Sequence, residues 1–157
     1  MRPLFAAFLF LAVACAPSRA ANITFTRVWP QYHTDDSFKS FYEYRTGREL
    51  TYKWNVLRSH PDDRGGLYFL IRVNNPGDSA VGTSFVVRVI SPDAIVTRVF
   101  NFFADVPKGS HLFEIGLTGS DWPGPRVLPV AWDVELQDAN GRVLVRKTSF
   151  LWEKPAP

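Results

Sequence analysis

Residues 130–146 read VAWDVELQDANGRVLVR, and this stretch decides the fold. Apolar side chains alternate with mostly polar ones along its first half: Val130, Trp132, Val134 and Leu136 against Ala131, Asp133, Glu135 and Gln137. A period of two places successive side chains on opposite faces of a β-strand. We therefore expect a strand with a buried face that carries Trp132 and a solvated face that carries Asp133.

A tight turn follows this strand. The linking residues 138–141 read DANG, which suits a type I turn followed by Gly141 in the left-handed conformation. On the return strand, Val143 and Val145 are then expected to face the core. The whole stretch predicts a β-hairpin.

The outer face of this hairpin has two interpretations. Asp133 and Glu135 lie on one side of their strand about 7 Å apart, a spacing in the range of paired glycosidase acids. Arg142 and Arg146 fall on the same face of the return strand. Cross-strand ion pairs between these arginines and carboxylates are therefore the preferred interpretation.

Short β-rich runs recur along the rest of the chain, between clusters of Pro, Gly, Asn and Asp. The runs are residues 23–29, 67–74, 82–90, 95–103, 111–118, 128–137 and 142–152. Strands at this spacing predict an all-β chain, an antiparallel β-sandwich of about seven to eight strands.

The closing hairpin, with its apolar strand, D-x-x-G turn and second strand, resembles that of many bacterial immunoglobulin-like and fibronectin-type domains. The resemblance covers the hairpin alone. It implies an immunoglobulin-like sandwich, and it carries no active site with it.

Residues 30–66 form an insert between the first two clear runs, longer than an ordinary loop. Asp35 or Asp36 is placed to cap a short helix over residues 37–44. Residues 53–58 predict an extra strand.

Two of these runs, 67–74 and 82–90, carry apolar side chains at positions that are expected to face solvent. Tyr68 is such a residue in the first run, and Val86 and Ile90 are such residues in the second. We expect the insert to fold back over this outer sheet face, with Phe38 and Phe41 buried against it.

The first twenty residues have the features of an export signal. Arg2 supplies a positive charge, residues 4–16 are almost wholly apolar, and small residues precede a cleavage point after Ala20. The apolar run is too short for a transmembrane helix, which needs about twenty residues. We expect a signal peptide at 1–20 and one secreted or periplasmic β-sandwich domain at 21–157.

Cys15 is the single cysteine, and residues 11–15, LAVAC, resemble the lipobox of bacterial lipoproteins. Lipidation of Cys15 would make the protein lipid-anchored in the cell envelope instead. Cleavage after Ala20 would leave a chain without cysteine, which excludes disulfides, thiolate catalysis and cysteine-ligated metal.

The charge balance gives no reason to expect nucleic acid or an anionic membrane as partner. Of 18 basic residues, Arg2 and Arg19 fall in the predicted signal, which leaves 16 against 15 acidic residues and a net charge of +1. A hydrophobic content of 46% and a charged content of 21% are typical of a folded domain.

A catalytic or metal-binding pattern is absent from the sequence. His33, His60 and His111 fall in separate segments without metal-ligand spacing, and neither a Gly-x-Ser-x-Gly elbow nor a phosphate loop occurs. We predict no catalytic residue, cofactor or metal ion.

Aromatic residues are concentrated in residues 29–54. They suggest a ligand surface, to which a loop tryptophan and two arginines would contribute: Tyr32, Tyr42, Tyr44, Trp122, Arg58 and Arg64. The alternative is a small second core beneath the insert, with Trp122 as a plug at the end of the sandwich.

Two functions follow from these features. The first is an exported, non-catalytic binding, adaptor or structural module with a protein or glycan partner. The alternative is a small carbohydrate-binding or carbohydrate-active domain that uses its aromatic surface.

Overall fold

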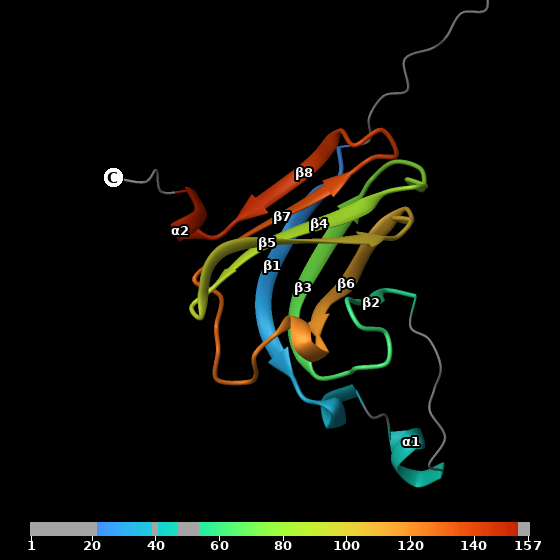
Figure 1. Ribbon diagram of the computed structural model, residues 1–157. Helices are drawn as coiled ribbons and strands as arrows, with labels where there is room; N and C mark the ends of the chain where they lie inside the picture. The colour runs from blue at the N-terminus through green and yellow to red at the C-terminus, as the bar shows by residue number, and fades with distance from the viewer. Residues whose placement is uncertain (1–21, 39–40, 47–53, 154–157) are drawn as a thin grey trace, which may run out of the picture.

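The computed structural model describes residues 22–38, 41–46 and 54–153 (Figure 1). The predicted signal peptide and Cys15 lie outside these residues. In chain order the elements are β1 (Thr24–His33), the 3-10 helix η1 (Asp35–Phe38), α1 (Phe41–Thr46), β2 (Val56–Arg58), β3 (Gly66–Asn75), β4 (Ser84–Ser91), β5 (Ala94–Phe103), β6 (Gly109–Thr118), the 3-10 helix η2 (Gly119–Asp121), β7 (Ala131–Gln137), β8 (Val143–Thr148) and α2 (Phe150–Glu153).

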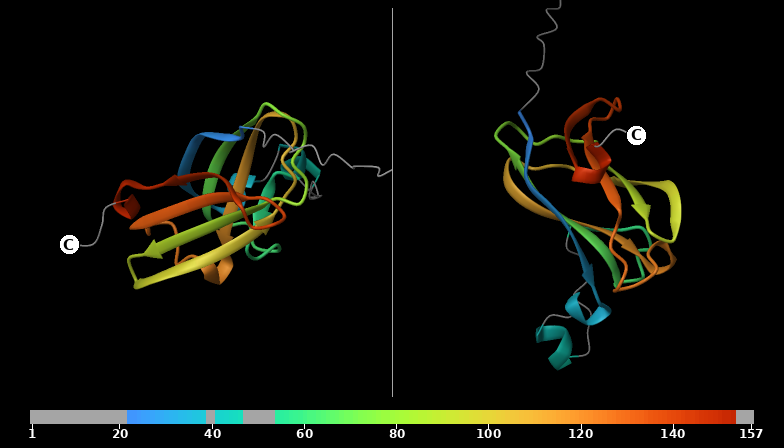
Figure 2. Two further views of the ribbon diagram at one scale, coloured as in Figure 1. Left: turned by 90° about the horizontal axis from the view of Figure 1, so that it is seen from above. Right: turned by 90° about the vertical axis from the view of Figure 1, so that its left-hand side faces the viewer.

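The strands form two four-stranded sheets, the first in the order β1-β3-β6-β2 and the second in the order β5-β4-β7-β8 (Figures 1 and 2). Strands β1, β3 and β6 match strands A, B and E of an immunoglobulin sandwich, and β4, β7 and β8 match C, F and G. Strand β5 takes the C′ position beside β4. The structure therefore confirms the predicted immunoglobulin-like β-sandwich.

The insert contributes the fourth strand of the first sheet. Strand β2 pairs in parallel with β6, with Val56 opposite Glu114, whereas every other named strand pair is antiparallel. It occupies the edge where strand D lies in an immunoglobulin constant domain. The extra strand predicted from the sequence is confirmed over its last three residues, because β2 spans Val56–Arg58.

One hydrophobic core lies between the two sheets. Its fully buried side chains include Leu67, Phe69, Ile71 and Val73 from β3, Phe85, Val87 and Val89 from β4, Phe113, Ile115 and Leu117 from β6, and Val134 and Leu136 from β7. The rings of Phe85 and Phe113 lie 4.9 Å apart between centroids and join the sheets across the middle. Burial of this apolar surface is the main force that holds the sheets together.

The turn of the closing hairpin forms as the sequence predicts. Gly141 has a φ of 77°, in the left-handed region that favours glycine. The Asp138 carboxylate accepts hydrogen bonds from the backbone N–H groups of Asn140 and Arg142 at 2.9 and 3.0 Å. An Asx-type arrangement of this kind fixes the turn locally.

The predicted core positions of the return strand need a correction. Val143 is 45% exposed, because the register shifts by one residue between Leu136 and Gln137. Leu136 is opposite Val145, and Leu144 is the extra residue of a β-bulge. Leu144 and Val145 both pack against the core as a result.

Two expectations for strand β7 are also corrected. Val130 is exposed because β7 begins after it, at Ala131. Trp132 faces the core but is only half-buried, with its ring 5.8 Å from that of Phe69. The predicted long last strand ends at Thr148, where the short helix α2 takes over.

The insert starts later than predicted, because β1 continues past Trp29 to His33. Pro30 pairs with Phe69 and His33 with Gly66 along the neighbouring strand β3. Proline is tolerated there because β1 is an edge strand. In place of one helix over 37–44 the structure has η1 and α1.

The prediction that the insert covers the outward sides of β3 and β4 together is wrong. Tyr68 of β3 is fully buried, but β4 belongs to the second sheet. The outward sides of β3 and β4 look away from each other, so one insert does not cover both. The side chains of Phe38 and Phe41 lie outside the described residues.

Candidate functional site

The outer face of the second sheet gathers side chains from all four of its strands. One row across it holds Val99, Arg88, Asp133 and Thr148, and the next holds Asn101, Val86, Glu135 and Arg146. Residues that are directly opposite on neighbouring strands point to the same side. The register therefore places two arginines and two carboxylates together.

These four residues, Arg88, Asp133, Glu135 and Arg146, form what we call the charged cluster. Arg88 Nη1 lies 2.7 Å from Asp133 Oδ2 and 3.1 Å from Glu135 Oε1. Arg146 Nε lies 2.8 Å from Asp133 Oδ1 and 3.4 Å from Glu135 Oε1. The Asp133 side chain is 0% exposed, so both arginines replace the water that this carboxylate lost on folding.

The charged cluster holds two positive and two negative groups, and its ion pairs hold these side chains in place. Burial lowers the pKa of Arg88, but its hydrogen bonds to Asp133 and Glu135 more than offset this, and the net shift is upward. The hydrogen bond to Asp133 likewise raises the pKa of Arg146. Both guanidinium groups stay charged at any pH at which the protein is folded.

The ion-pair interpretation of Asp133 and Glu135 is confirmed, with one partner exchanged. Arg142 bonds Asp138 in the turn instead, at 3.1 Å, because it lies four residues after that carboxylate. Arg88 takes its place in the cluster. Arg88 could not be identified from sequence patterns, because its position opposite Asp133 depends on the register between β4 and β7.

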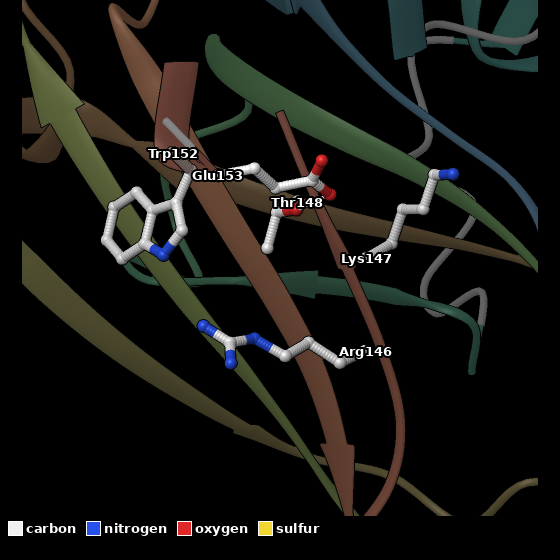
Figure 3. Close-up of a pocket in the computed structure, with 5 residues that line it drawn as sticks. All are labelled: Arg146, Lys147, Thr148, Trp152 and Glu153. Atoms are coloured by element: carbon white, nitrogen blue, oxygen red, sulfur yellow. Dashed lines mark hydrogen bonds between the residues drawn. The ribbon is translucent and has the colours of Figure 1, made fainter. Parts of the chain in front are cut away.

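A shallow groove adjoins the cluster through Arg146. It has a volume of about 550 Å³ and is lined by Arg146, Lys147, Thr148, Trp152 and Glu153 (Figure 3). In Figure 3 the Trp152 indole and the Arg146 guanidinium both extend over this groove. We refer to it as the Trp152 groove.

Helix α2 positions Trp152 through its contacts with β7. The Ser149 backbone N–H donates to the Trp132 carbonyl at 2.8 Å, and Ser149 Oγ accepts from the Trp132 N–H at 2.9 Å. The Thr148 hydroxyl donates a hydrogen bond to the Glu153 carboxylate at 2.5 Å, and this bond joins two of the residues that line the groove. The groove is thus held by backbone and side-chain bonds on both sides.

Comparison with solved structures yields likenesses at the level of the fold. A crystal structure of an immunoglobulin-like protein from Pseudomonas aeruginosa matches at 13% sequence identity and a TM-score of 0.33. The match covers 83% of this chain and 97% of that chain. No protein-family model and no curated protein matches the sequence.

Trp122 is a plug at the end of the sandwich, the alternative that the sequence left open. It is 4% exposed and belongs to the core, and its Nε1–H donates to the Val127 carbonyl at 3.1 Å. The indole is therefore not available to a ligand. Tyr32 packs against the core, and the side chains of Tyr42 and Tyr44 lie outside the described residues.

Arg58 and Arg64 meet at Tyr68 and hold the insert to the first sheet. Arg58 Nε donates to the Tyr68 hydroxyl at 2.9 Å, and that hydroxyl donates to the Arg64 carbonyl at 2.7 Å. Burial raises the pKa of Tyr68, so the phenol stays protonated and keeps its donor role. Arg64 Nη1 also lies 3.4 Å from Glu43 of α1. These contacts give both arginines a structural role.

His60, Ser120 and Asp121 come together without forming a catalytic triad. Ser120 Oγ lies 3.3 Å and Asp121 Oδ2 lies 3.1 Å from the same histidine atom, Nε2. A triad needs the serine and the carboxylate on different ring nitrogens. Arg98 binds the other Asp121 oxygen at 2.7 Å, so this carboxylate anchors β5.

Two further features concern the described residues only. They contain no group of three or more His, Cys, Asp or Glu side chains that could hold a metal ion. No helix within residues 22–38, 41–46 and 54–153 has the length and apolar character needed to cross a membrane.

Proposed function

We propose that this protein is a non-catalytic binding module that acts outside the cytoplasm. Its contact surface is the outer face of the second sheet, made by the charged cluster and the Trp152 groove. The observation that carries this proposal is the open groove, in which an indole lies beside a fixed network of ion pairs.

The composition of this surface supports binding. Tryptophan and arginine are the residue types that most often contribute large binding energies at protein interfaces. Arg146 is already held by Asp133 and Glu135, so less side-chain entropy is lost when a partner docks against it. A protein partner with both charge signs on its surface fits the mixture of Arg146 and Glu153 along the groove.

The same bonds argue against acid–base catalysis at this face. Both carboxylates are engaged by the guanidinium groups of Arg88 and Arg146, and Asp133 is fully buried. A general acid or base must contact the substrate. The buried Asp133 carboxylate does not meet this requirement.

Glycan binding is the second candidate, and Trp152 is the observation that favours it. An indole flanked by polar side chains also suits the face of a sugar ring. The candidate no longer rests on Trp122, which is buried.

Photo-crosslinking tests the proposed surface. With p-benzoylphenylalanine in place of Glu153, we expect a discrete crosslinked product in cells that make the protein naturally, because this exposed residue lines the groove. The same label in place of Leu151, which is exposed on α2 but does not line the groove, is the matched control. Trp152→Ala should remove the product from the groove label, with at least about a tenfold loss of affinity.

Equal products from both labels, or no product from the Glu153 position, would contradict the proposal. A change in tryptophan fluorescence with polysaccharide that disappears in Trp152→Ala would favour the glycan candidate instead.

The place of action rests on residues 1–20 of the sequence. We expect the mass of the mature chain to correspond to a start at Ala21, because small residues precede that bond. A chain that starts at a lipid-modified Cys15 would show the lipid-anchored alternative. A chain that keeps Met1 in the cytoplasm would overturn export in either form.

A further inference from the structure

The edge of the second sheet at β5 differs from the other sheet edges of the described chain. Exposed edges in natural proteins are protected by proline, lysine, bulges or short length. Strand β1 carries Pro30 and a register irregularity after Phe25, β2 has three residues, and β8 presents exposed Arg146 and Lys147. Each of these three edges therefore has a recognised protection.

The protection of strand β5 is confined to its start, where the register against β4 is irregular between Ala94 and Arg98; the strand pairs regularly from Arg98 to Phe103. Its sequence, AIVTRVFNFF, contains no proline, lysine or carboxylate over ten residues. Its one charged side chain, Arg98, bonds the Asp121 carbonyl at 2.8 Å and the Asp121 carboxylate at 2.7 Å. The positive charge that would repel another strand is thus bound within the molecule.

Apolar side chains of β5 face solvent along this edge. Val96 is 65%, Val99 is 53% and Phe103 is 78% exposed. Among the described residues β5 pairs with β4 alone, and the left-hand view of Figure 2 shows β5 as the outermost strand of its sheet. The free side of β5 offers backbone donors and acceptors together with apolar surface, which is the combination that binds an added strand.

We propose that β5 pairs with β5 of a second copy of this chain, antiparallel and across a two-fold axis at Val99. The second sheets of two subunits would then join into one continuous sheet. This inference does not rest on the proposed ligand surface, because β5 lies at the opposite edge of the sheet from β8.

The sequence of β5 is self-complementary in this register. Val99 is opposite its own copy, Thr97 is opposite Asn101, and Val96 is opposite Phe102. Arg98 is opposite Phe100, and the Arg98 guanidinium already lies over the Phe100 ring of its own chain at 5.0 Å. Val99 therefore meets an apolar residue, Thr97 meets a polar one, and each Arg98 guanidinium meets an aromatic ring.

Neighbouring registers of the two β5 strands are less favourable, so we expect the two copies to pair in this register. An axis at Arg98 would bring two arginines face to face. An axis at Phe100 would place Thr97 opposite Phe103 and Val99 opposite Asn101. Because the trimmed chain is nearly neutral, long-range repulsion between two copies is small.

A two-fold axis perpendicular to the sheet keeps both outer faces on the same side. The two Trp152 grooves of the dimer would then face one direction, at the two far ends of the joined sheet. Such a dimer presents its binding surface twice, which strengthens binding to a partner that repeats or lies on a surface.

Sedimentation of the mature protein over a range of concentrations tests this proposal. We expect a monomer–dimer equilibrium with a roughly micromolar dissociation constant, since a single strand pair forms a small interface. Val99→Lys should weaken it at least about tenfold, because two ammonium groups would meet about 4.5–5.5 Å apart at the backbone. Val143→Lys, on the β8 edge of the same sheet at 45% exposure, is the matched control and should dimerise normally.

A charge-reversal mixture makes the test specific for Val99. Val99→Lys and Val99→Glu should each be monomeric alone and should form a mixed dimer when combined. A wild-type chain that stays monomeric up to millimolar concentration overturns the proposal, as does normal dimerisation of Val99→Lys or failure of the mixture. Loss of groove crosslinking without a change in mass would concern the proposed function alone.

Discussion

Phe85→Ala is expected to lower the free energy of unfolding by about 3–5 kcal/mol, the range found for large aromatic side chains removed from cores. Phe85 belongs to β4 of the second sheet and is fully buried. Its ring contacts Phe113 at 4.9 Å and Phe25 at 6.3 Å, both from the first sheet. The substitution would therefore leave a cavity between the sheets where they are joined.

Urea unfolding monitored by circular dichroism measures this effect. Phe103→Ala is the matched control, because Phe103 lies on neighbouring β5 but is 78% exposed, and its loss should change stability by no more than about 0.5 kcal/mol. Domains of this size have a total stability of roughly 5–15 kcal/mol, so the Phe85 variant should lose a large share of it. Similar results for both phenylalanines would contradict the described core.

Arg88→Met is expected to destabilise the protein by about 2–3 kcal/mol. Removing one partner of a buried ion pair typically costs about 3–5 kcal/mol, and we expect less here because Arg88 is partly exposed and Arg146 remains. The buried Asp133 carboxylate would lose its bond of 2.7 Å to Arg88 Nη1. Arg142→Met, which breaks the exposed pair with Asp138, should cost much less, because water screens the charges of an exposed pair.

The double variant Arg88→Met/Asp133→Leu separates the ion pair from simple loss of packing. With the buried carboxylate gone, the apolar pair should recover at least half of the loss, because Glu135 and Arg146 still pair with each other. A double-mutant cycle from unfolding curves gives the coupling energy directly. Additive effects of the two substitutions would show that Arg88 and Asp133 do not interact in solution.

Local patterns in the sequence predicted much of this fold. The alternation around Val134 and Leu136 and the glycine at position 141 act over a few residues, and both the hairpin and its turn follow from them. The general sandwich follows from repeated strand and turn signals along the chain.

Features that depend on the pairing of distant strands could not be predicted from the sequence. The partnership of Arg88 with Asp133 needs the register of β4 against β7. The bulge at Leu144 shifts that strand by one residue, and the hydrophobic pattern does not mark it. The continuation of β1 through Pro30 depends on its position at a sheet edge, which only the assembled sheet defines.

The candidate site shows the same difference between features set by local sequence and features set by contacts between distant segments. Asp133, Glu135 and Arg146 were identified as neighbours on one face because they belong to one hairpin. The continuous β-rich pattern of residues 142–152 predicts a strand through Trp152. In the structure the strand ends at Thr148, and the next residue, Ser149, accepts a hydrogen bond from the Trp132 backbone. Trp122 had two possible roles, and only the packed structure places it inside.

The position of β2 has a consequence for the order in which the chain acquires its native state. This strand leaves the chain before β3 but pairs with β6, which is synthesised much later. Contacts between such distant segments form slowly, because a long stretch of chain must be closed first. Until β6 emerges, the segment around Val56 has no place to dock, so a chain whose synthesis is incomplete would expose this segment to chaperones and proteases.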